Sequence, residues 1–156
     1  MNDLERAKIN LNSHSICLCK NLTCLYSDLK GIAPMIDFID KGIDLKGYSV
    51  ADKFVGKAAA ILFAKAGIKE VFARIISIEA TRILVKFNIP FEYETLTEKI
   101  ISHDGVSICP MEKLVMDIDD PNEGYLLLKE KLEALKKNWF PTNFNIRNIW
   151  IISLLR

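Results

Sequence analysis

Short apolar runs alternate with amphipathic segments along most of the chain. The β-prone runs Ser15 to Lys20 and Leu22 to Ser27 predict a hairpin that turns around Lys20-Asn21. Glu70 to Ile76 is a continuous β-prone run between helical segments, which is typical of a buried central strand, and Pro90 to Tyr93 predicts a shorter strand. Strands that alternate with helices predict an α/β fold, here a three-layer α/β/α sandwich with a mixed sheet.

Helical periodicity and capping signals fill the segments between the predicted strands. The expected helices are an N-terminal helix within residues 1–12 and helices over 34–40, 49–66, 77–87, 95–102, 110–117 and from 121 to about 135. In the last of these, Tyr125, Leu128, Leu132 and Leu135 form the packing stripe.

The clearest helix start is predicted at Ser49. Its hydroxyl and the acid three residues later, Asp52, match the reciprocal capping pattern, and strong helix formers continue to Ala66 before Gly67. On such a helix Lys53 and Lys57 share one stripe near the start. The sequence therefore predicts two lysines one above the other beside exposed backbone N–H groups.

Composition narrows the classes of partner. The chain has 156 residues, of which 50% are hydrophobic and 26% charged, and its formal net charge is +1. This balance fits a single globular domain and provides no basic surface for nucleic acid or an anionic membrane. The first residues lack the apolar core of a secretory signal, and the longest apolar run, 149–155, is too short to span a membrane, so we expect a cytoplasmic protein.

The C-terminal segment differs in character from the rest. We expect residues 1–137 to form one domain and residues 138–156 to be an apolar extension that contains both tryptophans. An extra strand at the sheet edge, a subunit contact in a homodimer and a poorly ordered tail all remain open for this extension.

Four cysteines are too few to indicate a disulfide framework in a chain of this length. In a reducing compartment Cys17, Cys19, Cys24 and Cys109 should be free. With a turn at Lys20-Asn21, Cys17 would face Cys24 on one side of the hairpin, which explains their spacing as strand packing. Three cysteines without a nearby histidine do not complete a zinc site, so we expect no metal and no cofactor.

Two longer segments resemble a known family. The run SVADKFVGKAAAILFAKAGIKEVFARIIS, which contains VADK and GKAAA, and the run DGVSICPMEKLVMDIDDPNEGYLLLKEKL, which contains ICPME, resemble an uncharacterised prokaryotic family. The fold of that family looks like the fold of the cytidine deaminases, and the resemblance covers roughly residues 14 to 137. It implies a deaminase-like fold for this chain and leaves its function unassigned.

The deaminase resemblance raises the question of zinc chemistry. Zinc deaminases need an H-x-E segment at one helix start and a P-C-x-x-C segment at the next. In the predicted arrangement Val50-Ala51-Asp52 takes the first position and residues 76–80 the second, and neither contains a histidine or cysteine. We therefore expect that the protein is not a zinc-dependent deaminase and that Asp52 is at most an acid without a metal.

The leading functional hypothesis is a small anionic, nucleotide-like ligand held near two helix starts. Its candidate residues are Ser49, Asp52, Lys53 and Lys57, together with Asp104 and Glu112 before and within the helix at Pro110. The structural alternative treats the two acids as helix caps and the two lysines as solvated surface residues.

A thiol-dependent enzyme is the second hypothesis, and an interaction protein that forms a homodimer is the third. Cys109 precedes Pro110 at a helix start, where the helix dipole lowers a thiol pKa. His103 and Asp104 lie a few residues earlier, but neighbouring side chains in a loop rarely align as a relay. Packing is the alternative for Cys109, and exposed loop positions are the alternative for His103 and Asp104.

Overall fold

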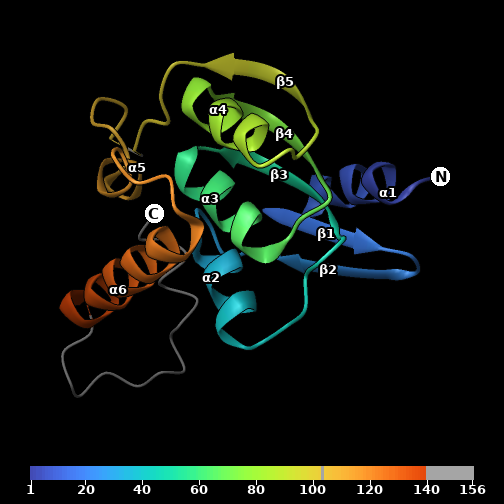
Figure 1. The fold of residues 1–156 in the computed structure, drawn as a ribbon, viewed down its shortest axis with the longest axis horizontal. Helices are drawn as coiled ribbons and strands as arrows, with labels where there is room; N and C mark the ends of the chain where they lie inside the picture. The colour runs from blue at the N-terminus through green and yellow to red at the C-terminus, as the bar shows by residue number, and fades with distance from the viewer. Residues whose placement is uncertain (103, 140–156) are drawn as a thin grey trace.

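The computed structural model describes residues 1–102 and 104–139 (Figure 1). Its strands are β1 (Ile16–Lys20), β2 (Thr23–Ser27), β3 (Ser49–Val55), β4 (Glu70–Ser77) and β5 (Phe91–Thr97). Its helices are α1 (Asp3–Asn10), the 3₁₀ turn η1 (Leu11–Ser13), α2 (Ala33–Asp40), α3 (Lys57–Ala66), α4 (Ile78–Lys86), α5 (Pro110–Leu114) and α6 (Pro121–Trp139).

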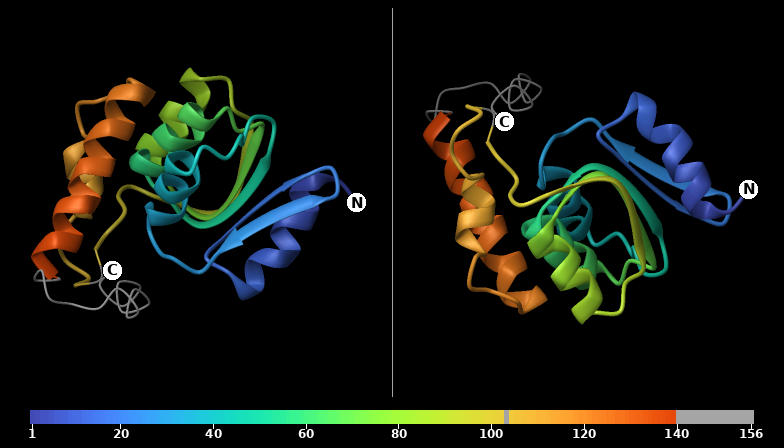
Figure 2. Two further views of the ribbon diagram at one scale, coloured as in Figure 1. Left: turned by 90° about the horizontal axis from the view of Figure 1, so that it is seen from below. Right: turned by 90° about the horizontal axis from the view of Figure 1, so that it is seen from above.

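A five-stranded mixed sheet organises the chain, with the strand order β2-β1-β3-β4-β5. The hairpin β1–β2 is antiparallel and β1 pairs antiparallel with β3, whereas β3, β4 and β5 are parallel. Helices α2, α3 and α4 lie on one face and α1 on the other, and α6 packs against the outer side of α3 (Figure 2). The predicted mixed α/β sheet flanked by helices is confirmed, with α5 and α6 added outside the helical layer.

The core is divided by the sheet. Apolar side chains from α3, α4 and the strands fill the larger cluster, which includes the fully buried Ile61, Phe63 and Leu84. On the opposite face α1 covers a smaller cluster made of Ala7, Leu11, Cys17, Cys19, Ala51 and Phe72. None of the described helices is both long and apolar enough to cross a membrane.

The hairpin forms as predicted but in another register. Asn21 and Leu22 make the turn, Asn21 with a φ of 55°, so that Lys20 pairs with Thr23 and Cys19 with Cys24. The expected pairing of Cys17 with Cys24 is wrong, because the turn lies one residue later than the sequence suggested. The expectation of four free thiols is also wrong, since this register brings Cys19 and Cys24 into a disulfide, with Cys17 and Cys109 free.

The segment predicted to start a helix at Ser49 is the central strand β3. Local capping signals around Ser49 and Asp52 are overridden because this segment pairs with β1 on one side and β4 on the other. The helix begins only at Lys57 and ends as expected, with Gly67 at a φ of 74°. Lys53 therefore lies in a strand and does not share a helical stripe with Lys57.

Strand β5 is longer than predicted. The expected helix over 95–102 is wrong, because Thr95 to Thr97 continue the pairing with Ile75 to Ser77 of β4. The remaining predicted helices are present, and the one at Pro110 ends early, at Leu114.

Asp52 is a carboxyl group within the central strand β3. The parallel pairing of β3 with β4 keeps one register from Ser49–Glu70 to Val55–Ile76. One carboxylate oxygen of Asp52 accepts the Phe54 N–H at 3.4 Å, which competes with the strand ladder at this point. The side chain is only 8% exposed, and its burial raises its pKa to about 7. Asp52 is therefore a buried strand residue and does not cap a helix.

We expect Asp52→Asn to change how stability depends on pH. In the unfolded chain this carboxyl has a pKa of about 3.9. Between about pH 4 and 7 the folded state therefore holds a proton that the unfolded state has released. As pH rises through that window, this group therefore lowers the free energy of unfolding of the wild-type protein by about 1.4 kcal/mol per pH unit. Urea denaturation from pH 4 to 8 should show a flatter profile for Asp52→Asn and higher stability than wild type at pH 8.

The control is Asp117→Asn, which removes an exposed carboxylate from the same protein. It should follow the wild-type profile. A profile of Asp52→Asn that is as steep as that of the control would contradict the assignment of a protonated, buried Asp52.

Candidate functional site

The start of α3 holds an internal carboxylate. Gly56 precedes the helix in an extended conformation and has no side chain to cap it. The backbone N–H groups of Lys57 and Ala58 donate to the two carboxylate oxygens of Glu112, at 2.6 and 2.7 Å. A carboxylate more than fifty residues away in the sequence thus satisfies two of the free donors at this helix start.

Glycine at position 56 makes room for that carboxylate. A Cβ atom built on Gly56 would lie 1.8 Å from Glu112 Oε1 and 2.9 Å from Ile100 Cγ1. The backbone of Gly56 adopts a φ of −99°, which any residue can adopt. Space for Glu112, and not backbone conformation, therefore requires glycine here.

Lys57 lies beside the same helix start and is buried. Its ammonium donates to the Met116 carbonyl at 2.8 Å and forms an ion pair with Asp119 Oδ1 at 2.9 Å. Asp119 also accepts two hydrogen bonds from Arg82, at 3.0 and 2.9 Å, and lies 3.4 Å from the Lys86 ammonium. The Arg82 guanidinium and then Lys57 hold the pKa of Asp119 well below its usual range.

We call Gly56, Lys57, Ala58, Glu112 and Asp119 the α3 capping site. The pKa of Glu112 is raised because burial penalises its charge more than the Ala58 and Lys57 N–H groups stabilise it. The Lys57 ammonium pairs with Asp119, and the Arg82 guanidinium pairs with both Asp119 and Glu79. The site is therefore an anion-binding helix start with its own anion in place.

Of the candidate residues, only Lys57 and Glu112 meet. Ser49 is buried at the opposite end of β3, where its hydroxyl donates to Glu70 Oε1 at 2.7 Å. Asp52 lies within the same strand, and Lys53 is half-buried next to it. These three positions are not at the start of α3 because the helix begins eight residues later than Ser49.

Asp104 organises an exposed loop. Its carboxylate accepts the N–H groups of Val106 and Ser107, both at 2.9 Å, and the Ser102 hydroxyl at 2.8 Å. The Val106 N–H, followed by these other donors, lowers the pKa of Asp104. Its hydrogen bonds therefore define a turn within its own loop.

Cys109 is free and half-exposed directly before α5, as the sequence predicted. Its N–H donates to the Ile100 carbonyl at 3.1 Å, and its side chain makes no capping hydrogen bond. Helix α5 has only five residues, so its dipole is small. His103 lies outside the described residues, and the reactivity of Cys109 stays a prediction.

Sequence reasoning allowed a close approach at Gly56, with simple helix packing as the alternative, but it missed Arg82 and Asp119. The helix start signal began at Asp120, which accepts the Glu123 N–H at 3.0 Å at the start of α6. Arg82 looked like any exposed residue of an amphipathic helix. No spacing in the sequence connects these residues, because their contacts form only when α5 and α6 pack against α3 and α4.

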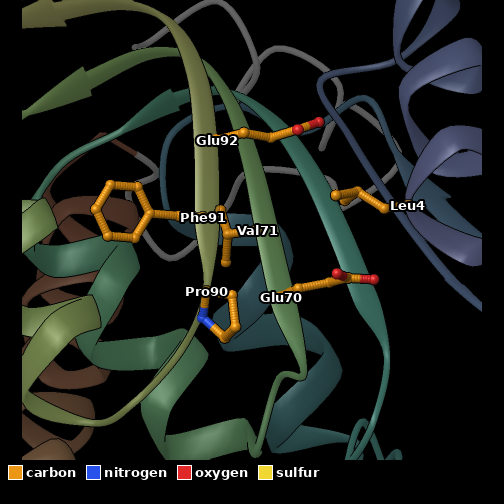
Figure 3. A pocket seen from close by; sticks show the side chains of 6 residues that line it. All are labelled: Leu4, Glu70, Val71, Pro90, Phe91 and Glu92. Carbon is orange, nitrogen blue, oxygen red and sulfur yellow. The ribbon is translucent and has the colours of Figure 1, made fainter.

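Two surface pockets lie away from the α3 capping site. One, of about 130 Å³, lies between α1 and the N-terminal ends of β4 and β5, where the carboxylates of Glu70 and Glu92 point toward Leu4 (Figure 3). The other, of about 220 Å³, runs between α2 and α6. The two carboxylates make the first pocket unfavourable for an anion. Ser49 lies beside this pocket, where it donates to Glu70.

The residues at the two helix starts do not fit the zinc ion that the deaminase resemblance implies. The alignment of Val50-Ala51-Asp52 with an H-x-E segment is wrong, because these residues lie within β3. The helices after β3 and β4 begin with Gly56-Lys57-Ala58 and Ser77-Ile78-Glu79. Neither segment offers a histidine or cysteine, so these two helix starts lack the ligands that a deaminase zinc ion requires.

We expect Gly56→Ala to destabilise the protein by about 1–3 kcal/mol, because the new methyl group overlaps Glu112 Oε1. Urea denaturation measures this cost. In a Glu112→Ala background the same change should cost clearly less, which a double-mutant cycle will show. Equal costs in both backgrounds would mean that the glycine does not serve the carboxylate.

Comparison with known proteins identifies a family without an assigned function. The family model described as "TM1506: Domain of unknown function (DUF1893)" matches residues 6–132. A crystal structure of a DUF1893 family protein (TM1506) from Thermotoga maritima superposes with a TM-score of 0.75 at 28% sequence identity, covering 84% of this chain and 91% of that chain. We find no match among curated proteins. The chain therefore belongs to the DUF1893 family of unknown function.

Proposed function

We propose that this protein binds a small carboxylate- or phosphate-bearing ligand, nucleotide-like in class, at the start of α3, in exchange with Glu112. One observation carries the proposal: two N–H groups at this helix start already hold a carboxylate at 2.6 and 2.7 Å. The same two N–H groups can donate to a pair of oxygens on a ligand.

The contacts of Glu112 support the idea that it can be exchanged. It is carried by the five-residue helix α5, which is flanked by the Asp104 loop and by the turn before α6. Burial raises the pKa of its carboxyl, so the ionised side chain is less favourable in this place than in water. An incoming anion therefore replaces a group that has a desolvation cost of its own.

Nearby cations favour phosphate over a simple carboxylate. Lys57, Arg82 and Lys86 all contact Asp119, close to the N–H groups that hold Glu112. A dianion placed at the start of α3 would gain attraction from this cluster, and guanidinium groups suit phosphate oxygens geometrically. Two backbone N–H donors and a flanking group of cations therefore favour a ligand that carries a phosphate group.

The deaminase-like fold is a further part of this proposal. An antiparallel hairpin that joins a parallel set of three strands, with helices starting at the C-terminal ends of β3 and β4, supports the resemblance to nucleoside-binding relatives. In α/β sheets ligands bind outside these strand ends. The α3 capping site lies at this position, directly after β3.

Competition by Glu112 gives the proposal a sharp test. A tethered carboxylate has an effective concentration in the millimolar range, so it weakens the apparent affinity for a free anion. Removing it with Glu112→Ala should therefore strengthen anion binding, whereas loss of an ordinary ligand-contacting residue would weaken it. The affinity for phosphate and for nucleoside monophosphates, measured by calorimetry, should rise by about tenfold or more in this variant.

Formate and phosphate should also raise the melting temperature of Glu112→Ala at constant ionic strength. The matched control is Glu130→Ala, which removes an exposed glutamate from α6 and should respond like wild type. Adding Lys57→Met to Glu112→Ala should abolish the gain. If no anion stabilises Glu112→Ala beyond the control, Glu112 is only a structural cap and the proposal is wrong.

A further inference from the structure

Three cysteine sulfurs meet beneath α1, on the opposite face of the sheet from the α3 capping site. The sulfur atoms of Cys17, Cys19 and Cys24 all lie within 4.8 Å of one another. Cys19 and Cys24 form the disulfide, and Cys17 Sγ lies 3.8 Å from Cys19 Sγ. This cluster takes no part in the proposed anion site.

The hairpin register brings the three thiols together. Cys19 pairs with Cys24 across the hairpin at a Cα–Cα distance of 4.2 Å, the close spacing of a non-hydrogen-bonded antiparallel pair. Cys17 lies two residues from Cys19 on the same strand and therefore on the same face. Ala51, Phe72 and the side chains of α1 enclose this face.

These positions suit a metal ion once the disulfide is reduced. Two thiolates on one ion with a metal–sulfur distance of about 2.3 Å lie about 3.8–4.0 Å apart. Cys17 and Cys19 already have this separation, and rotation of the Cys24 side chain after reduction would place its sulfur at a similar distance.

The donor set selects the type of metal. No fourth histidine, cysteine, aspartate or glutamate joins the group within residues 1–102 and 104–139. Structural zinc sites use four ligands, whereas soft Cu(I) is satisfied by two or three thiolates. Three sulfurs in an apolar setting therefore favour Cu(I) over zinc.

We propose that Cys17, Cys19 and Cys24 form a Cu(I)-binding site in the reduced protein, and that the Cys19–Cys24 disulfide closes this site in the oxidised protein. A dithiol reductant opens it by thiol–disulfide exchange: the Cys19–Cys24 bond breaks, both sulfurs become thiols, and the reductant becomes a disulfide. Cu(I) then binds without changing its oxidation state, and the displaced thiol protons pass to water.

The surroundings fit this chemistry. Cys17 is fully buried among apolar side chains. Cys24 is only partly buried, which gives an incoming ion a first thiol to contact. Arg6 of α1 donates to the Asn21 carbonyl at the hairpin turn, so this helix is held against the hairpin that carries the three sulfurs.

The test is an anaerobic Cu(I) titration of the full chain against a chromogenic Cu(I) chelator. Protein reduced with a dithiol and then freed of it should bind one Cu(I) per chain and gain a near-ultraviolet sulfur-to-copper charge-transfer band. Protein oxidised to the Cys19–Cys24 disulfide, confirmed by mass spectrometry, should lack this band and this affinity.

Variants separate the cluster from the remaining cysteine. Cys17→Ser should lower Cu(I) affinity by about 100-fold or more, since even outer-shell losses at metal sites cost about 10–100-fold. Cys17→Ala should do the same and keeps an apolar side chain if the serine disturbs the core. Cys109→Ser is the matched control and should bind like wild type.

Three outcomes would overturn the proposal. They are unchanged Cu(I) affinity in folded Cys17→Ala, unchanged affinity after oxidation, and loss of binding in Cys109→Ser. Tight binding of zinc at one ion per chain in preference to Cu(I) would also overturn the choice of metal. Circular dichroism of each variant confirms that the compared proteins are folded.

Discussion

The contact between the Glu112 carboxylate and the first two N–H groups of α3 anchors α5 against the central helix and leads the chain toward α6. It fixes α5 against the start of α3, and the next residues bring Asp119 to Lys57 and Arg82. Because Gly56 has no side chain, the carboxylate can approach the helix start closely. One long-range carboxylate thus provides both the cap of the central helix and the attachment of an outer helical segment.

This arrangement leaves the charged groups of the candidate site paired with one another. Lys57 and Arg82 are paired with Asp119, and the N-terminal donors of α3 are paired with Glu112. A ligand for this site must therefore replace an internal partner, which demands higher charge or more contacts than a single carboxylate offers. Glu112 carries a desolvation cost, and that cost is the physical basis for the exchange that we propose.

The sequence predicted the elements whose signals are local. The buried strand β4, the helix α4 with its Ser77 cap and the end of α3 at Gly67 all follow from periodicity and capping residues. It failed at β3, where a capping pattern around Ser49 and Asp52 competed with strand pairing on both sides and lost. The helix cap supplied by Glu112 and the ion pairs of Asp119 had no local signal, because tertiary packing creates them. Lys57 and Glu112 were both named as candidates, but their direct contact could not be read from their separation.

The most direct test of the capping contact is an NMR titration of the wild-type protein that follows the Glu112 carboxyl carbon together with the amide protons of Lys57 and Ala58. Burial and the shared hydrogen bonds lead us to expect a Glu112 pKa above its ordinary value, with both amide protons shifting at the same midpoint. A Glu112 carboxyl that titrates at its ordinary value, with the two amide protons unaffected, would contradict the account.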